Sequence, residues 1–121
     1  MIGNAVWFEI PTNDFERAIT FYEAVFQVKL RREKIGGDIA VFPGDASAVT
    51  GALVSQAGYA PAANGAVVYL SAGDDLSATL ARAVASGGKV VAPKTALPPG
   101  MGHYAHFEDC EGNRVGLHSE N

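Results

Sequence analysis

The hydrophobic residues of this chain recur with two different periods that alternate along the sequence. From Phe15 to Phe26, apolar residues occur at three- and four-residue steps, the spacing of one buried helix face. The stretch Leu76–Val84 has the same spacing and ends before Gly87 and Gly88. Short apolar or alternating runs, which are typical of strands, come before and after both stretches. The pattern therefore predicts two helices, each preceded by one strand and followed by three.

The predicted elements repeat, because both halves of the chain have the order βαβββ. Neither half has enough apolar surface to fold alone, so we expect one α+β domain with a curved mixed sheet and helices on its outer face. The domain is expected to cover residues 1–121, with modules at about 2–57 and 65–119 joined by a linker at about 58–64. The predicted strands are Val6–Ile10, Val28–Glu33, Asp38–Phe42 and Thr50–Ser55, then Ala66–Leu70, Lys89–Ala92, His103–Glu108 and Asn113–His118.

Composition and charge narrow the class of protein. The formal net charge is −4, and basic residues cluster only at 31–34, so we expect no nucleic-acid partner. No stretch approaches the ~20 apolar residues that span a bilayer, and the first residues lack the features of a secretory signal. A cytoplasmic protein with no membrane partner is therefore expected. Cys110 is the chain's single cysteine, so no intrachain disulfide can form.

Two groups of motifs carry a family resemblance. Trp7–Pro11 precedes Asp14–Ile19 and Phe21-Tyr22, and Phe107–Asp109 precedes Glu111–Leu117. Over nearly its whole length, the chain resembles the glyoxalase/bleomycin-resistance/dioxygenase family, the vicinal oxygen chelate superfamily. The resemblance implies paired βαβββ modules around a cupped cavity, commonly in homodimers whose chains complete one another's sites. Members include glyoxalase I (lactoylglutathione lyase), ring-cleaving dioxygenases and metal-free proteins that sequester bleomycin.

In the enzymes of this family, His and Glu side chains from the first and last strands of the modules hold a divalent metal. Matched residue by residue, these positions fall on Trp7, on Val67 or Val68, and on Gly116, and the remaining one lies within 51–53. None of these residues has a side-chain nitrogen, oxygen or sulfur atom that can ligate a metal, since the indole nitrogen of Trp7 carries a proton and has no free lone pair. No metal is therefore expected at the family positions, and the resemblance does not carry the metal-dependent lyase activity to this chain.

Strand alternation predicts which side chains line the cavity, since residues two apart point the same way. Gly116 is expected to leave room for a ligand. Aromatic faces with a few polar groups suit a small organic molecule, although the two tyrosines are equally well explained as core aromatics. The predicted ligand-binding residues are Trp7, Glu9, Tyr69, Tyr104, His106 and His118.

Each of these residues has a structural explanation beside the functional one. Trp7 either stacks on a ligand or fills the space of the missing metal. Glu9 either binds a ligand or forms an ion pair with Arg114 or His118. His106 and His118 are individually explained as structural histidines, but together with Glu9 they are candidates for catalytic acid and base.

Three functions remain open. The first is binding of a small aromatic or cationic molecule, for sequestration or sensing, with no cofactor. The second is a lyase, isomerase or dioxygenase-type enzyme whose divalent metal is displaced to Glu9, His106 and His118. The third is a metal-free isomerase or lyase in which Glu9 removes a proton and a His or Tyr donates one.

Two further segments of the sequence are considered for a functional role. Cys110 lies between Asp109 and Glu111, whose charges should raise its pKa, so we expect no nucleophilic role. The segment Ala96–Gly102, rich in Pro and Gly, is either a plain connector or a rim over the cavity.

Overall fold

The computed structural model describes residues 2–45 and 47–121, so Met1 and Ala46 lie outside the described residues. The element order repeats βαβββ twice, which confirms the α+β class. The first half contains β1 (Trp7–Pro11), α1 (Phe15–Phe26), β2 (Arg31–Lys34), β3 (Asp38–Val41) and β4 (Thr50–Ser55). The second half contains β5 (Tyr69–Ser71), α2 (Ser77–Ala85), β6 (Lys89–Ala96), β7 (His103–Glu108) and β8 (Arg114–Ser119).

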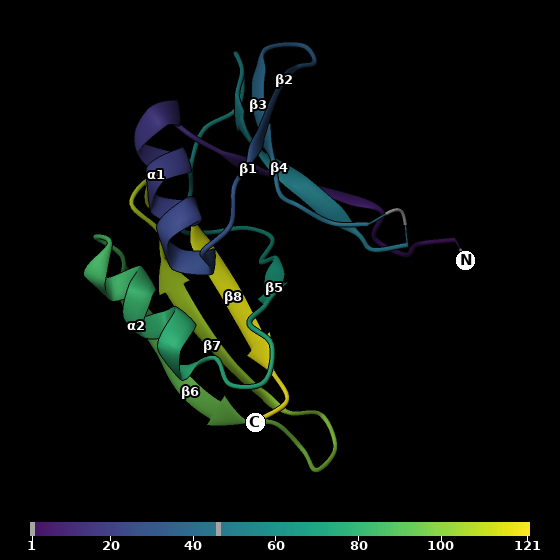
Figure 1. Ribbon diagram of the computed structural model, residues 1–121, viewed down its shortest axis with the longest axis vertical. Helices are drawn as coiled ribbons and strands as arrows, with labels where there is room; N and C mark the ends of the chain where they lie inside the picture. The colour runs from purple at the N-terminus through teal and green to yellow at the C-terminus, as the bar shows by residue number, and fades with distance from the viewer. Residues whose placement is uncertain (1, 46) are drawn as a thin grey trace.

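The mixed sheet predicted from the sequence is divided into two four-stranded sheets. The first has the strand order β1-β4-β3-β2 and the second β5-β8-β7-β6. In each, the first strand of the module pairs in parallel with the last, and the other pairs are antiparallel. Figure 1 shows the first sheet above the second, with α1 and α2 side by side along one side of the molecule.

The N-terminus of helix α1 is capped by a side chain. Asp14 is the N-cap, and its carboxylate accepts a hydrogen bond from the backbone nitrogen of Arg17 at 3.1 Å. Glu16 does not cap the helix but pairs with Arg32 on β2 at 2.6 Å. The helix ends at Phe26, and its C-cap is Gln27, whose φ of 55° is left-handed. Its buried face is Ala18, Ile19, Phe21, Tyr22 and Val25.

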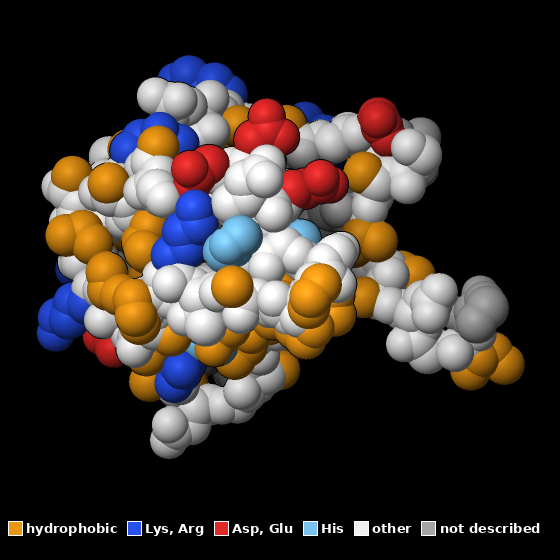
Figure 2. All heavy atoms as spheres, turned by 90° about the horizontal axis from the view of Figure 1, so that it is seen from below, with side chains coloured by type: hydrophobic (Ala, Val, Ile, Leu, Met, Phe, Trp, Pro, Cys, Tyr) orange, Lys and Arg blue, Asp and Glu red, His pale blue; other side chains and the backbone are white. Residues whose placement is uncertain are grey.

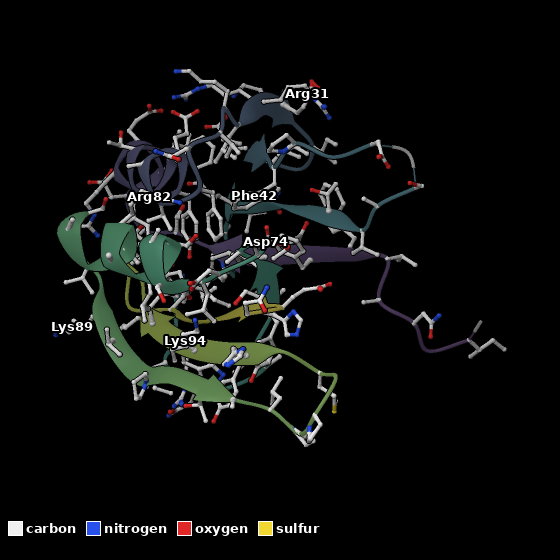
Figure 3. All side chains as sticks on the ribbon, turned by 60° about the horizontal axis from the view of Figure 1, so that its bottom comes forward. Arg31, Phe42, Asp74, Arg82, Lys89 and Lys94 are labelled. Atoms are coloured by element: carbon white, nitrogen blue, oxygen red, sulfur yellow. The ribbon has the colours of Figure 1, made fainter. Side chains whose placement is uncertain are left out.

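Helix α2 buries a slightly different stripe from the one predicted. Leu76 and Ala83 are buried as expected, but Val84 is 47% exposed and Thr79 takes a buried place instead. Thr79 and Ala83 are four residues apart and share one helix face, from which Val84 is turned away. Arg82 lies between the two helices (Figure 3), where its Nε donates to the carbonyl of Val25 at 2.7 Å.

One hydrophobic core joins the two modules. It contains buried residues from α1, α2 and both sheets. The rings of Phe21 on α1 and Phe107 on β7, for example, have centroids 6.1 Å apart. Among the described residues, no helix is long and apolar enough to cross a membrane.

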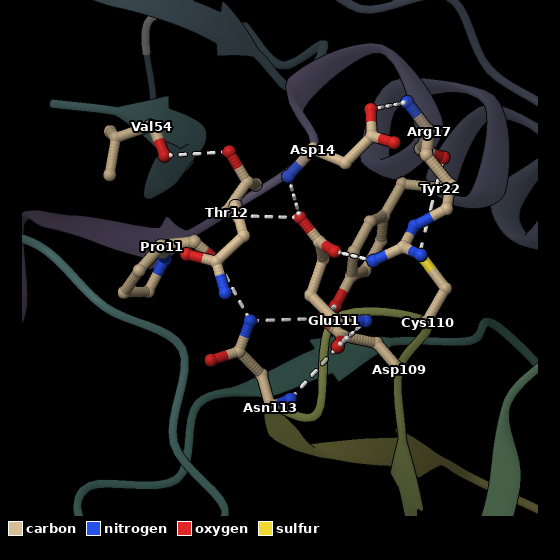
Figure 4. A network of polar contacts seen from close by, with 11 residues as sticks. Pro11, Thr12, Asp14, Arg17, Tyr22, Val54, Asp109, Cys110, Glu111 and Asn113 are labelled. Atoms are coloured by element: carbon tan, nitrogen blue, oxygen red, sulfur yellow. Dashed lines mark hydrogen bonds and ion pairs between the residues drawn. The ribbon is translucent and has the colours of Figure 1, made fainter.

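A polar network fastens the β7–β8 turn to the start of α1 (Figure 4). The side chain of Glu111 is almost completely buried and pairs with Arg17. It also accepts hydrogen bonds from the backbone nitrogens of Asn13 and Asp14, each at 2.6 Å. A carboxylate at a helix N-terminus satisfies donors that the helix itself leaves unpaired. The second module therefore caps the helix of the first.

Candidate functional site

The first part of the candidate site lies on the face of the first sheet that is turned away from α1. Ile10 and Leu53 belong to the core on the helix side, so Glu9 and its partner Ala52 point the other way. Trp7 shares this open face, and its Nε1 donates to Oε2 of Glu9 at 3.3 Å. Trp7 is 43% exposed, so part of its ring is available to a ligand.

Tyr59 joins this group from the linker, a contribution that sequence reasoning missed. The Glu9 carboxylate raises the pKa of the Tyr59 hydroxyl, first through hydrogen bonding and then through its charge. The only signal in the sequence is a single aromatic residue within a linker of small residues. No strand periodicity could have placed it, because its position depends on the path of the linker.

The second part lies on the face of the second sheet turned away from α2. The hydroxyl oxygen of Tyr69 is 2.6 Å from Nε2 of His106. On the other side of the same imidazole, Nε of Arg114 donates to Nδ1 at 2.9 Å. The ring of Tyr104 meets His106 edge to face, with centroids 5.6 Å apart. The structure therefore brings together Tyr69, Tyr104 and His106, and adds Arg114 as a direct partner.

The surroundings of His106 favour its neutral form. Burial is the first cause of its lowered pKa, and the positive charge of Arg114 is the second. All three histidines of the chain lie on β7 or β8. Figure 2 shows histidine side chains reaching the surface beside acidic and basic groups.

Gly116 does not leave the open space that the sequence suggested. The Tyr69 ring packs directly on it, and a Cβ atom at Gly116 would lie 2.5 Å from Cδ2 of that ring. The reason is the parallel register of β5 and β8, which pairs these two residues. A glutamate ligand at Gly116 would therefore collide with Tyr69.

The other family metal positions are equally unsuited to a cation. Gly51 is the register partner of Phe8, and a Cβ there would lie 2.2 Å from the Phe8 carbonyl oxygen. Ala52 shares the open face with Trp7 but is completely buried and has no donor atom. Val67 precedes β5 and offers only an alkyl group. The residues present do not fit the metal of the family.

The hydrogen bonds and ion pairs of the described residues do not join His118 to His106 or to Glu9. Its Nε2 lies 2.7 Å from the carbonyl oxygen of Met101, in the connector between β6 and β7. Glu9 lies on the other sheet, with Trp7 as its partner. Among the described residues, no three His, Cys, Asp or Glu side chains form a group that could hold a metal. The displaced metal site expected at Glu9, His106 and His118 is thus not assembled within one chain.

A groove of about 400 Å³ lies along β1 and the start of β8, and one residue from each part of the site lines it. These two residues are Glu9 and Arg114, and much of the remaining lining is apolar. The ion pairs of the described residues include neither Glu9 with Arg114 nor Glu9 with His118. Two residues of opposite charge therefore line one groove without forming an ion pair with each other. Apolar residues that line it include Ala5, Phe8, Val67 and Val68.

Cys110 lies outside this site, in the β7–β8 turn. Burial raises its pKa to about 11, with further contributions from Asp109 and Glu111. The expected direction is therefore confirmed, although burial is the larger cause. The thiol stays protonated near neutral pH.

Comparisons with known proteins agree with the fold. The model of the Glyoxalase/Bleomycin resistance protein/Dioxygenase superfamily matches residues 4–117. A glyoxylase-like domain-containing protein from Didymella fabae is 33% identical, and the match covers 92% of this chain and 89% of that protein.

Two solved structures from Streptomyces sp. CB03234 are similar over almost their whole length. A glyoxalase/bleomycin resistance protein has a TM-score of 0.69 and 26% identity, covering 96% of this chain and 100% of that one. TnmS3, an antibiotic binding protein, has a TM-score of 0.65 and 24% identity, covering 99% and 98%.

Proposed function

Because the chain belongs to the glyoxalase/bleomycin resistance protein/dioxygenase superfamily, we propose that it binds a small organic molecule against the open faces of its two sheets. The main observation behind this proposal is the position of the Tyr69 ring. It packs on Gly116, where metal-dependent relatives would carry a metal-ligating residue. An aromatic surface that is 50% exposed thus stands in the place of a metal ligand. Exposed aromatic area beside a few oriented polar groups is typical of sites for planar organic ligands.

The groove between the sheets supports the same proposal. Its apolar lining provides contact area, and Glu9 and Arg114 offer one charge of each sign. A ligand with a donor or cationic end and an acceptor end could bind both residues, the first end to Glu9 and the second to Arg114. The similarity to an antibiotic binding protein favours binding, by sequestration or sensing, over turnover.

We propose further that a second copy of the chain completes the site. Trp7 and Tyr69 lie on open sheet faces, and Ile2 and Val6 are exposed just before β1. Exposed apolar side chains close to a binding surface are typical of interfaces. Sedimentation at micromolar concentration should give a dimer, and ligand titration should give the number of ligands bound per chain.

The cytoplasmic location stays a prediction, which cell fractionation would test.

The test of binding uses Trp7, the single tryptophan of the chain, as a reporter within the site. A set of planar aromatic compounds is titrated while the intrinsic fluorescence is followed, and each binder is recovered and analysed by mass spectrometry. We expect at least one compound to change the Trp7 emission and to be recovered unchanged. Tyr69→Ala should weaken that binding, whereas Val84→Ala, on the exposed side of α2, should not.

Two results would contradict the proposal. If a bound compound is converted, the protein is an enzyme, and the acid–base alternative replaces simple binding. If none of the compounds changes the emission or binds in calorimetry, the open faces are not a ligand site for planar aromatics.

A further inference from the structure

His106 has a hydrogen-bond partner on each ring nitrogen, and these partners determine where its proton lies. Arg114 Nε is 2.9 Å from Nδ1. A guanidinium group can only donate, so Nδ1 must accept with its lone pair. A neutral imidazole carries one proton, which is therefore on Nε2.

The position of this proton decides the role of Tyr69. Nε2–H points at the Tyr69 oxygen, 2.6 Å away, so the phenol accepts this hydrogen bond. If the phenol donated instead, both ring nitrogens would have to be without a proton. The hydroxyl proton of Tyr69 is therefore left for another acceptor. Since the side chain is 50% exposed, that acceptor can come from outside the chain.

We propose that Tyr69 donates a hydrogen bond to the ligand, so that the ligand presents an acceptor oxygen, a carbonyl or an oxyanion, on an aromatic skeleton. This inference rests on the proposed function and adds the chemical class of the ligand. Stacking on Gly116 holds the Tyr69 ring, and the bond from His106 orients its oxygen.

Arg114 strengthens the preference for an acceptor. It uses Nε for His106, and among the hydrogen bonds and ion pairs of the described residues none involves its Nη groups. Arg114 also lines the groove, so it brings a positive charge and these donors to that side of the site. Glu9, which lines the same groove, would take the donor or cationic end of the same ligand. The ligand is thereby oriented across the two sheets.

His106 is a positioning residue in this arrangement. Neither nitrogen has a lone pair available to take a proton from a ligand, since Nδ1 accepts from Arg114 and Nε2 carries the proton. The catalytic base considered for His106 from the sequence is therefore disfavoured by its two hydrogen bonds.

The first test needs no ligand. Nitrogen-15 NMR of the free protein at neutral pH should show His106 as the neutral tautomer protonated on Nε2. The tautomer protonated on Nδ1 would overturn the assignment of Tyr69 as a donor, whatever the protein binds.

The second test compares three probes that share one ring system: 2-naphthoate, 2-acetonaphthone and 2-naphthylmethylammonium. In calorimetry, the two probes with acceptor oxygens should bind at least about tenfold more tightly than the ammonium. Tyr69→Phe should weaken their binding by roughly ten- to a hundredfold. Thr20→Ala removes an exposed hydroxyl from α1 and serves as the matched control, with unchanged binding.

Variants of His106 distinguish the effect of its hydrogen bond to Tyr69 from the effect of its ring on the shape of the site. His106→Phe removes the donor to Tyr69 and should weaken binding of 2-naphthoate, whereas the side-chain amide of His106→Gln should restore part of it. Tighter binding of the ammonium, or no effect of Tyr69→Phe, would overturn the inference. Failure of all three probes, with the expected tautomer present, would instead count against the proposed function.

Discussion

The Tyr22 hydroxyl on α1 donates a 2.6 Å hydrogen bond to Oδ2 of Asp109, 87 residues further along the chain. Both residues are buried. Oδ1 of Asp109 accepts from the backbone nitrogens of Glu111 and Asn113, at 2.8 and 2.9 Å. A buried carboxylate in this environment requires its hydrogen bonds, because an unsatisfied charge in the core is costly. The contact therefore ties the first helix to the last turn of the chain.

Removing this hydroxyl should destabilise the protein. We expect Tyr22→Phe to lower the free energy of unfolding by about 1–3 kcal/mol, since the carboxylate loses a donor that water cannot easily replace. Urea denaturation measures the change. Tyr104→Phe is the matched control, and its partly exposed hydroxyl should cost less than about 0.5 kcal/mol. Equal effects of the two substitutions would contradict the prediction.

The same contact should make stability fall at alkaline pH. Burial, followed by the charge of Asp109, raises the pKa of Tyr22 well above its ordinary value of 10.0. The folded state thus holds the phenol proton more tightly than the unfolded chain. This contribution is complete below pH 10 and is lost as the pH rises through the folded-state pKa. The difference in melting temperature between the natural protein and Tyr22→Phe should therefore shrink above pH 10. A constant difference would refute this linkage.

Cys110 should react slowly with alkylating reagents while the protein is folded. Its pKa is about 11, against 9.0 for an unperturbed thiol. At pH 8 the folded protein therefore contains about a hundredfold less thiolate than the unfolded chain. Iodoacetamide labelling with and without urea measures the ratio. Fast labelling of the folded protein would show that the turn opens or that the carboxylates and burial do not protect the thiol.

His106 should remain neutral at pH 7 and titrate below an ordinary histidine. Burial and the charge of Arg114 lower its pKa, so the folded state binds this proton less readily than the unfolded chain. Its contribution to stability is complete above the ordinary value of 6.5 and is lost as the pH falls below it. NMR titration measures the pKa directly. Arg114→Gln should raise the pKa of His106, whereas Arg31→Gln on β2 should leave it unchanged.

Gly51 and Gly116 should differ in their tolerance of a methyl group. A Cβ at Gly51 would lie 2.2 Å from the backbone oxygen of Phe8, which cannot move without shifting β1. Gly51→Ala should therefore cost about 1–3 kcal/mol or more. At Gly116 the obstacle is the half-exposed Tyr69 ring, which can swing outward. Gly116→Ala should therefore cost less stability than Gly51→Ala. It should, however, break the hydrogen bond between Tyr69 and His106.

Denaturation and the NMR signals of His106 distinguish these two outcomes. If Gly116→Ala keeps the Nε2 hydrogen bond of His106 intact, the Tyr69 ring is not held in place by the glycine.

Much of the fold followed from local patterns in the sequence. The position of α1, the strands Thr50–Ser55 and His103–Glu108, and the repeat of βαβββ were predicted correctly, because they follow from the hydrophobic periods of the elements. Alternation along β7 also placed Tyr104 and His106 on one face, as the structure has them. The lack of donor side chains at the family's metal positions was inferred from strand positions in the same way, and the absence of a metal stays a prediction.

The pairing of side chains was decided only by the tertiary structure. Tyr69 lies on Gly116 because β5 and β8 pair in register across 47 residues, and the His118 imidazole turns to the Met101 carbonyl because a loop brings that carbonyl within reach. Glu9 stays apart from His106 since their strands belong to different sheets. Period and residue type determine which face a side chain occupies, whereas its partner depends on register, loop path and rotamer, which are fixed only when distant segments pack together.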